Sequence, residues 1–375
     1  MKASGRQRVW TINGDFVSLR PTGVARYARE VTLALDSLLA AKHPLTAGLE
    51  LNILAPRSPT DLPLAAIPVK ILAEFSRPRL PQFWVQVQLP RHVTGGLLSF
   101  CNLAPIWTRR HIVCIHDLHT RMMPQSYGLG FRWAHRVILP LLGRRARWIT
   151  TVSQLSRDHL SAFGIAPAEK IAITYNGSDH ASRWNADKAA LTLGERPYVV
   201  ALGQRQRYKN TELIWRIAEP LDHLGLDIYV AGDLDAKSLG TFGPSTPSNV
   251  RLFGRVSDDD LAKLFKHALA FLFPSRIEGF GLPAVEAMAQ DCPVIASTSP
   301  CLPEICGDAA IYAGPDDGGA WVSAVQRLHS DPTLRTAMIE RGHARAQRYR
   351  WRDIAEIYLR LMASVDGCDP QHELQ

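Results

Sequence analysis

The stretch that most constrains the fold of this chain is residues 270–296, AFLFPSRIEGFGLPAVEAMAQDCPVIA. Its first residues are apolar, which predicts a short buried strand that ends at Pro274. A loop with two glycines follows, Leu282-Pro283 begins a helix, and Pro293–Ala296 predicts the next strand. Glycines allow a ligand to approach the backbone, and the free N–H groups at the start of a helix attract negative charge. This succession therefore predicts a site that cradles a phosphate.

Two carboxylates frame the predicted helix. Glu278 lies in the loop before it, and Glu286 lies about one turn inside it, eight positions later. Because a carboxylate that faces a phosphate would repel it, we expect both to contact hydroxyl groups, such as those on either side of the diphosphate in a sugar nucleotide. A solvated helix face with ordinary surface glutamates would explain Glu286 alone. It would not explain the glycines, the proline and both acids together.

A dinucleotide site is a second alternative for the same stretch. Gly279, Gly281 and Ala284 form a Gly-x-Gly-x-x-Ala run, which resembles a dinucleotide fingerprint. In that fingerprint the first glycine directly follows the strand, whereas here Pro274–Glu278 intervene. The sugar-nucleotide interpretation is therefore favoured.

The stretch resembles the donor-binding motif of retaining glycosyltransferases of the GT4 family, in which seven residues separate two glutamates. The surrounding FPS-x-x-EGFGLP-x-x-EAMA is similar to the family pattern as well. The resemblance implies that Glu278 lies near the donor sugar and that Glu286 binds the nucleotide ribose. It also implies a donor-binding loop made of Gly279, Phe280, Gly281 and Leu282.

The N-terminal part of the chain carries a second, weaker element of the resemblance. Val9–Ile12 predicts a strand, and Val24–Leu39 predicts a helix with apolar residues at helical spacing. The loop Arg20–Gly23 between them would lie at the edge of a parallel sheet where ligands bind. The resemblance implies that Gly23 lies beside the donor diphosphate.

A histidine follows a later apolar strand. Ile112–Ile115 runs into His116-Asp117, and such a strand end points into the ligand crevice of an α/β protein. The resemblance implies that His116 contacts the donor sugar. Two alternatives stay open: a hydrogen-bonded core histidine, or a metal pair with His119, for which no third ligand has a matching spacing.

A basic loop follows Tyr198–Leu202, which predicts the first strand of a second sheet. The resemblance implies that a basic pair in this loop clamps the donor diphosphate. We assign the pair to Arg205 and Lys209, with Arg207 as an alternative for the arginine. An arginine can donate two parallel hydrogen bonds, and a lysine presents a compact positive charge. Both can stabilise the negative charge of a departing diphosphate. We expect no cofactor and no obligatory metal, because no Asp-x-Asp motif stands where a metal would bridge a diphosphate.

Charge is distributed unevenly along the chain. Residues 1–180 hold 22 Lys and Arg against 10 Asp and Glu, a net +12, whereas residues 181–375 hold 21 against 25, a net −4. The basic half predicts an anionic partner. Within it, residues 120–147 predict an amphipathic basic helix of the kind that lies on anionic lipid, or else an ordinary surface helix. Its key residues are Arg132, Arg136, Arg144, Arg145, Arg147, Phe131 and Trp133. No nucleic-acid-binding module is recognisable.

We predict an α/β protein of the GT-B fold, in which two Rossmann-like doubly wound domains face each other across a cleft. Residues 1–180 form the acceptor-side domain, and residues 181–350 form the domain that binds the nucleotide sugar. Residues 351–375 form a C-terminal helix that crosses back and a loose tail.

The resemblance implies the function of a retaining hexosyltransferase. It moves a mannose- or glucose-type hexose from a GDP- or UDP-sugar to a hydroxyl of a lipid-linked or growing polysaccharide or lipopolysaccharide glycan. The resemblance implies that the departing phosphate oxygen helps to take the acceptor proton. Scattered cysteines and the lack of a signal peptide predict a cytoplasmic protein, at the inner face of the membrane. The alternatives are a non-catalytic sugar-nucleotide- or glycan-binding protein and a GT-B epimerase or hydrolase.

Overall fold

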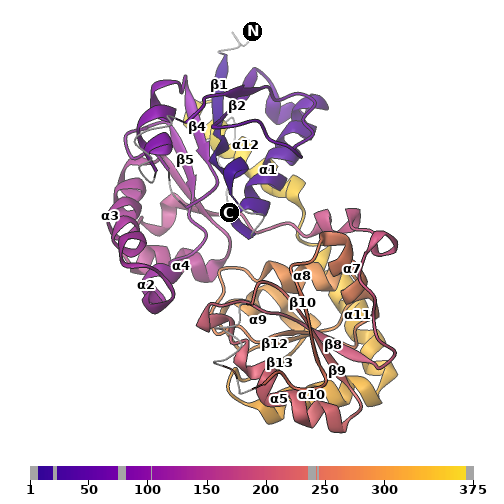
Figure 1. The fold of residues 1–375 in the computed structure, drawn as a ribbon. Coiled ribbons are helices and arrows are strands. Elements are labelled where there is room, and N and C mark those ends of the chain that lie inside the picture. The colour runs from indigo at the N-terminus through magenta and orange to yellow at the C-terminus, as the bar shows by residue number, and fades with distance from the viewer. Residues whose placement is uncertain are drawn as a thin grey trace. The chain divides into compact units, whose positions relative to one another are not determined.

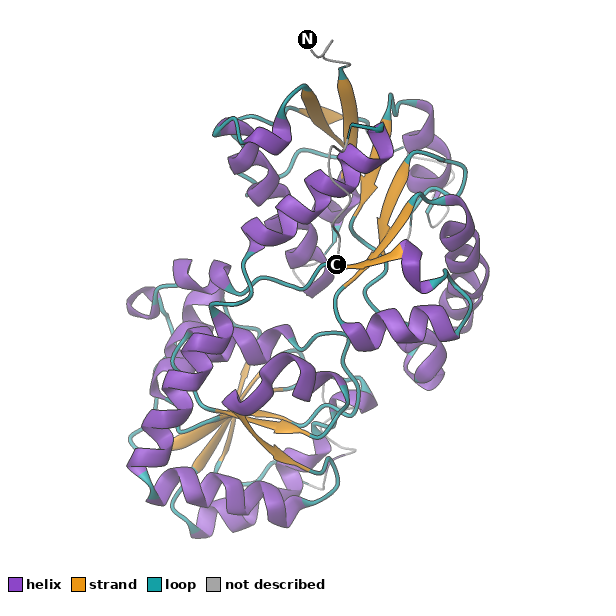
Figure 2. Ribbon diagram, turned by 180° about the vertical axis from the view of Figure 1, so that it is seen from behind, coloured by secondary structure: helices purple, strands orange, loops and turns teal. Residues whose placement is uncertain are grey.

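The computed structural model describes residues 7–19, 23–74, 82–102, 104–234, 242 and 245–368. The chain divides into two compact units, Met1–Gly177 with Arg350–Gln375, and Ser178–Tyr349. The boundaries expected from the sequence, 180/181 and 350/351, lie close to these divisions. Each unit holds a parallel sheet with helices on both faces (Figures 1 and 2).

The first unit contains a seven-stranded parallel sheet in the order β3-β2-β1-β4-β5-β6-β7. Its strands are β1 (Arg8–Asn13), β2 (Leu49–Ala55), β3 (Val69–Ile71), β4 (Gly96–Ser99), β5 (His111–Cys114), β6 (Trp148–Thr151) and β7 (Ile171–Ile173). Its helices are α1 (Gly23–Ala40), α2 (His119–Met122), α3 (Leu129–Arg145), α4 (Gln154–Ala162) and α12 (Trp351–Asp366). The strand order reverses between β1 and β4, where Ile12 pairs with Leu98. Such a switch point is where open α/β sheets bind ligands.

The second unit contains a six-stranded parallel sheet in the order β10-β9-β8-β11-β12-β13. Its strands are β8 (Tyr198–Leu202), β9 (Asp227–Ala231), β10 (Val250–Gly254), β11 (Phe271–Phe273), β12 (Val294–Ser297) and β13 (Ala310–Ala313). Its helices include α5 (Glu212–His223), α7 (Asp258–His267), α8 (Leu282–Ala289), α9 (Cys301–Cys306), α10 (Gly318–Ser330) and α11 (Pro332–Ala346). Here the order reverses between β8 and β11, where Ala201 pairs with Leu272. The prediction of an α/β protein with two doubly wound sheets is confirmed.

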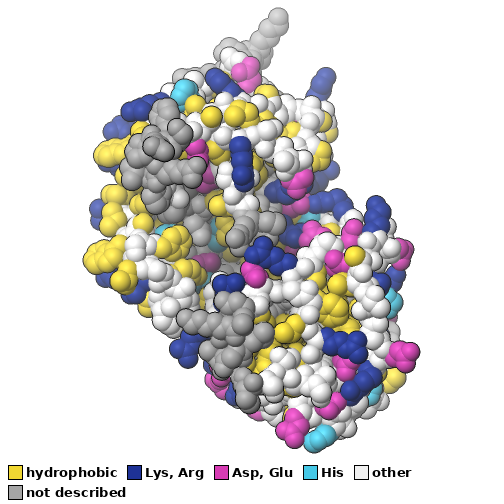
Figure 3. Space-filling model, viewed as in Figure 1, with side chains coloured by type: hydrophobic (Ala, Val, Ile, Leu, Met, Phe, Trp, Pro, Cys, Tyr) yellow, Lys and Arg dark blue, Asp and Glu magenta, His cyan; other side chains and the backbone are white. Residues whose placement is uncertain are grey.

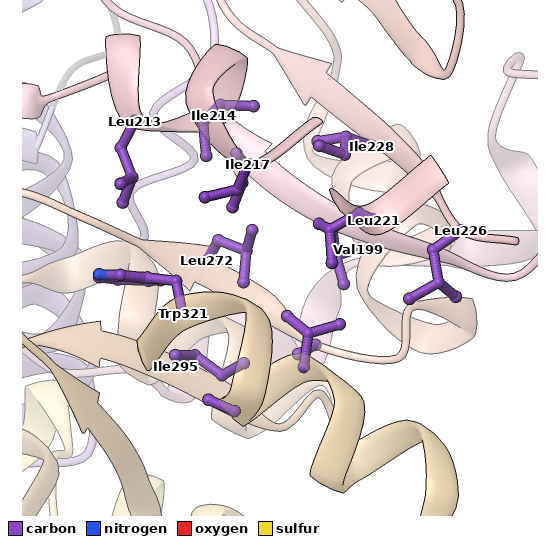
Figure 4. Packing of buried hydrophobic residues seen from close by; sticks show 14 of the residues in the cluster. Val199, Leu213, Ile214, Ile217, Leu221, Leu226, Ile228, Leu272, Ile295 and Trp321 are labelled. Carbon is purple, nitrogen blue, oxygen red and sulfur yellow. The ribbon is translucent and has the colours of Figure 1, made fainter. Parts of the chain in front are cut away.

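The core of the second unit shows why its helices lie on the sheet. Leu213, Ile217 and Leu221 recur every four residues along α5 and are buried on one face of it. They pack against apolar residues of the strands and against Trp321 of α10 (Figure 4). The indole N–H of Trp321 donates to the Gly314 carbonyl at 2.9 Å, so this large side chain is buried without an unsatisfied polar group.

Helix α12 belongs to the first unit and packs against α1 (Figure 1). The hydroxyl groups of Tyr27 and Tyr358 lie 2.9 Å apart, and the ring of Trp351 meets Tyr27 edge-on at 5.6 Å. Gly367 ends the helix in the left-handed conformation, with φ 70°. The tail predicted to be loose lies largely at residues 369–375, outside the described residues.

Local sequence signals also explain where several helices begin. Ser257 and Asp260 form a reciprocal capping box at the start of α7. Asp317 and Asp331 accept backbone N–H groups at the starts of α10 and α11.

One expectation about the first unit is wrong. Residues 120–147 do not form a single helix, because α2 ends at Met122 and α3 begins only at Leu129. Pro124 lies between them, and it cannot donate the backbone hydrogen bond that a continuous helix needs. Of the arginines named above, Arg132, Arg136, Arg144 and Arg145 lie in α3, whereas Arg147 lies beyond its end.

Candidate functional site

The carboxyl ends of β8 and β11 bring two predicted site residues together. Lys209 follows β8 and Glu278 follows β11, and these strands are neighbours at the switch point of the second sheet. The Lys209 Nζ donates to Glu278 Oε1 at 2.7 Å, and the two side chains are 15% and 8% exposed. The ammonium group compensates the carboxylate charge, so the pair presents little net repulsion to an incoming phosphate.

The loop that carries Lys209 is tied to its neighbours by residues that sequence reasoning missed. Asn210 adopts the left-handed conformation, with φ 55°. Its Nδ2 donates to the carbonyls of Pro274 and Pro315 at 3.2 and 2.7 Å. The backbone N–H of Arg276 donates to the Tyr208 carbonyl at 2.7 Å. Lys209 is therefore held by the loops that follow β11 and β13 as well as by its own.

Arg276 also forms the best-defined ion pair of this edge. Its guanidinium donates to both carboxylate oxygens of Asp316, at 2.8 and 2.6 Å. These hydrogen bonds lower the pKa of Asp316 below its ordinary value and raise the pKa of Arg276. The two-pronged geometry fixes the loop orientation more than it adds stability, because Asp316 is exposed to solvent.

Helix α8 begins as the sequence predicts. The four predicted loop residues, Gly279, Phe280, Gly281 and Leu282, are all buried and lead directly into it. Gly281 has a φ of 95°, a backbone conformation that favours glycine, and a Cβ there would lie 2.7 Å from Leu302 Cδ2. The N-cap residue, Gly281, has no side chain that could cap the helix, and the first turn holds no acidic residue. Its N-terminal backbone groups are therefore suited to an anion.

Glu286 lies inside α8 and is 4% exposed. Its Oε1 accepts a hydrogen bond from Nε2 of His180 at 2.8 Å, and His180 is fully buried. His180 comes from a 3₁₀ turn, Asp179–Arg183, at the start of the second unit. The sequence offers no signal for this pairing, because the two residues are 106 positions apart and the turn has no clear periodicity.

Arg205, the other predicted member of the basic pair, lies beside Asp233. Its guanidinium lies 3.8 Å from Asp233 Oδ1, with its side chain 53% exposed. Arg255 donates to the other oxygen of Asp233 at 2.5 Å. Arg207, the alternative for the basic pair, is also exposed. The assignment of Arg205 to the diphosphate stays a prediction.

His116 lies in the first unit and is buried. Its Nε2 donates to the Phe100 carbonyl at 2.8 Å, and its backbone N–H donates to Asn102 Oδ1 at 2.7 Å. Burial lowers the pKa of His116, but the neighbouring Cys114 and the Phe100 carbonyl raise it above its ordinary value. These are the contacts of the core histidine that the sequence leaves open as an alternative. A contact with the donor sugar stays a prediction.

Gly23, the other site residue predicted in the first unit, has no close neighbour that would require a glycine. Gly23 is the first residue of α1, and a Cβ there would meet nothing within 4 Å. Arg20, Pro21 and Thr22, the rest of its loop, lie outside the described residues. Across the described ranges, no group of three or more His, Cys, Asp and Glu side chains could hold a metal ion.

Asp15 is a further candidate that sequence reasoning missed. It follows β1 by two positions, at the switch point of the first sheet. Its Oδ1 is buried and has no hydrogen-bond partner within the described part of the chain. Burial raises its pKa to about 7, although a hydrogen bond from the Phe16 backbone opposes the shift. A buried carboxyl group with an unused oxygen at such an edge is a candidate for ligand contact.

Known proteins resemble both the second unit and the whole chain. Residues 182–345 match the family described as "Glycosyl transferases group 1". The chain is 28% identical over 256 residues to an O-antigen chain mannosyltransferase of Salmonella typhimurium, covering 63% of this chain and 68% of the relative. It is 33% identical over 308 residues to a D-inositol 3-phosphate glycosyltransferase of Kineococcus radiotolerans, covering 70% of each. The solved structure of a sucrose-phosphate synthase from Thermosynechococcus elongatus has a TM-score of 0.70 and 17% identity, covering 96% of this chain and 100% of that one.

Proposed function

The chain belongs to the glycosyl transferases group 1 and has the GT-B fold, and we propose that it is a retaining, GT4-type hexosyltransferase. It moves a mannose- or glucose-type hexose from a GDP- or UDP-sugar to a hydroxyl of a lipid-linked or growing polysaccharide or lipopolysaccharide glycan. The observation that supports this most is the Lys209–Glu278 pair at the switch point of the second sheet, in the loop that leads to the uncapped start of α8. The mannosyltransferase relative of O-antigen chains supports the hexose and the glycan.

Each site residue has a role in this proposal. The diphosphate lies at the start of α8, where backbone N–H groups and Lys209 face it, and Arg205 adds positive charge. Glu278 contacts the donor sugar, and Glu286 binds the ribose. In the transfer step the bond from the anomeric carbon to the diphosphate breaks, and the acceptor oxygen bonds to the same face. The departing phosphate oxygen takes the acceptor proton, so no protein nucleophile is needed.

Ligand-induced stabilisation tests the donor class. The thermal midpoint of the purified chain should rise with a GDP- or UDP-linked hexose or with the matching nucleoside diphosphate, because a ligand that binds only the folded state stabilises it. If none of these compounds raises the thermal midpoint, the proposal is overturned.

Incubation with the donor but without an acceptor separates the alternatives, since an epimerase or hydrolase would release epimer or free sugar. Activity should persist in EDTA, and its loss with rescue by a divalent ion would contradict the metal-free reaction.

Helix α3 presents an apolar ridge on the side opposite its core. Leu129, Trp133 and Val137 follow at four-residue spacing and are 70%, 66% and 55% exposed. The residues that α3 buries, including Leu139 and Leu142, fall on the other side of the helix. No helix in the described ranges is long and apolar enough to cross a membrane. An exposed stripe of this kind indicates an interaction surface.

Arginines flank the ridge. Arg136, Arg144 and Arg145 are exposed, and the guanidinium of Arg145 lies 4.3 Å from the ring centroid of Trp107, which is also exposed. Figure 3 shows hydrophobic and basic side chains side by side over this part of the first unit. Residues 118–157 contain no Asp or Glu. Apolar and aromatic groups among arginines fit an anionic bilayer surface, so we place the protein at the inner face of the membrane.

Vesicle sedimentation tests this contact. The protein should sediment with anionic vesicles and less so as salt rises. Changing Arg136, Arg144 and Arg145 to Gln should reduce sedimentation. The matched control changes Arg327, Arg341 and Arg348, which are exposed on the second unit, to Gln. Equal sedimentation of both variants, or none with the wild type, would contradict membrane contact and favour an acceptor in solution.

A further inference from the structure

The contact between His180 and Glu286 is buried, and the histidine is the more buried of the two residues. His180 is 0% exposed and Glu286 4%, and Nε2 lies 2.8 Å from Oε1. The imidazole ring meets Trp184 edge-on, with the centroids 5.6 Å apart. A buried carboxylate needs strong hydrogen-bond donors, and an imidazole N–H supplies one directly. His180 is therefore placed to act on the carboxylate but too enclosed to touch a ligand itself.

The position of His180 is set by its backbone rather than by Glu286. The side chain of Gln290, the residue that follows α8, donates to the Ala181 carbonyl at 2.7 Å. The Ser178 hydroxyl donates to the Ala346 carbonyl at 2.8 Å, and the Ser178 N–H donates to the Tyr349 carbonyl at 2.8 Å. These bonds fasten the turn Asp179–Arg183 to α8 and to the end of α11. The imidazole is thus a fixed donor against which the longer glutamate side chain is oriented.

We propose that His180 is a positioning residue that holds the Glu286 carboxylate in the orientation that accepts the ribose hydroxyls of the donor. The inference rests on the proposed function, in which Glu286 binds the ribose. A glutamate has several rotatable bonds, and ordering it when the nucleotide arrives would cost affinity. His180 removes that cost because the carboxylate is already fixed in the folded protein.

Calorimetric titration with UDP and GDP tests the inference, since one of them should bind the wild type. His180→Ala should weaken binding of that nucleotide about tenfold, the effect expected when an interaction of roughly 1.4 kcal/mol is lost. His180→Gln should stay within about threefold of the wild type, because its amide N–H can replace Nε2. Glu286→Ala should weaken binding on its own, and adding His180→Ala to it should weaken binding no further.

Tyr198→Phe is the matched control, because it removes another buried hydrogen bond of the second unit, from the Tyr198 hydroxyl to the Leu264 carbonyl at 3.0 Å, at the start of β8. It should leave nucleotide affinity unchanged. Three results would overturn the inference: wild-type affinity in His180→Ala, an equal loss in Tyr198→Phe, or a further loss when His180→Ala is added to Glu286→Ala. Thermal unfolding of each variant shows that it is folded. If the wild type binds neither nucleotide, the proposed function fails and the inference fails with it; if only the His180 variant behaves as wild type, the inference alone fails.

Discussion

The two sheets reverse their strand order at equivalent places, but the carboxylates beside the two switch points are held differently. In the second unit, Glu278 accepts a hydrogen bond from Lys209 at 2.7 Å. In the first unit, burial raises the pKa of Asp15 to about 7, and its Oδ1 has no partner among the residues that the structure describes. A buried carboxylate with an ammonium partner has its charge compensated, whereas burial without a cation favours the protonated form. The ligand edge of the second sheet therefore suits an anion, whereas that of the first sheet suits a neutral group such as a hydroxyl.

The largest effect should come from breaking the pair in the second unit. Lys209→Ala removes the cation that faces both Glu278 and the proposed diphosphate. Turnover with a nucleotide-sugar donor should fall about 10²–10³-fold, the range for loss of one preorganised charge-stabilising group. Chemical unfolding should show a stability loss of about 2–3 kcal/mol, because Glu278 is left as a poorly solvated, unpaired charge.

The double variant Lys209→Met with Glu278→Gln separates the two effects. It removes both charges, so it should regain stability relative to Lys209→Ala without regaining turnover. Wild-type turnover in Lys209→Ala would contradict the assignment of this edge to an anionic donor.

The next effect concerns the carboxyl group of the first unit and depends on pH. Because the pKa of Asp15 rises from its ordinary 3.8 to about 7 on folding, protonated Asp15 favours the folded state. That contribution is complete below about pH 4 and is lost as pH rises through 7. Asp15→Asn stays neutral, so its unfolding free energy relative to the wild type should rise by about 3–4 kcal/mol between pH 4 and pH 8. Urea unfolding across this range measures the difference. A difference that is constant with pH would show that Asp15 is as ionised here as in water.

The next prediction concerns His116, which lies in the first unit. His116→Ala leaves the Phe100 carbonyl without its donor, so stability should fall by about 1–3 kcal/mol. If the protein folds, turnover should fall while affinity for UDP or GDP stays unchanged, since those contacts belong to the second unit. Turnover and calorimetry on the same preparation check both statements. Complete loss of folding, or unchanged turnover in a folded variant, would leave His116 with the role of a core histidine.

The smallest effect is expected at Arg205, which is exposed and lies 3.8 Å from Asp233. Arg205→Ala should change stability by no more than about 0.5 kcal/mol, as is usual for surface substitutions. Turnover should fall about tenfold if the guanidinium reaches the diphosphate. Arg255→Ala is the control, because Arg255 shares Asp233 but has no proposed contact with the donor. Equal turnover of the two variants would remove Arg205 from the site.

Local pattern was sufficient to predict much of the second unit. The strand, the glycine loop and the helix around Glu278 and Gly281 follow from short-range properties: an apolar run, a residue that must adopt positive φ, and a proline in the first helical turn. Prediction from local pattern failed where a strand was too short to show a period or where a proline interrupted a helix. The four-residue strands β4 and β13 show no period, and Pro124 interrupts the helix expected over 120–147.

The sequence by itself thus determined the two-sheet α/β architecture and the identity of Lys209, Glu278 and Glu286 as site candidates. Only the tertiary structure decided what they touch. Lys209 meets Glu278 across 69 positions because β8 and β11 are neighbours, and His180 meets Glu286 across 106 positions because a turn is fastened to α8. Strand order and burial are properties of the whole folded chain, since they arise from the packing of distant segments into one core. No window of residues along the sequence contains them.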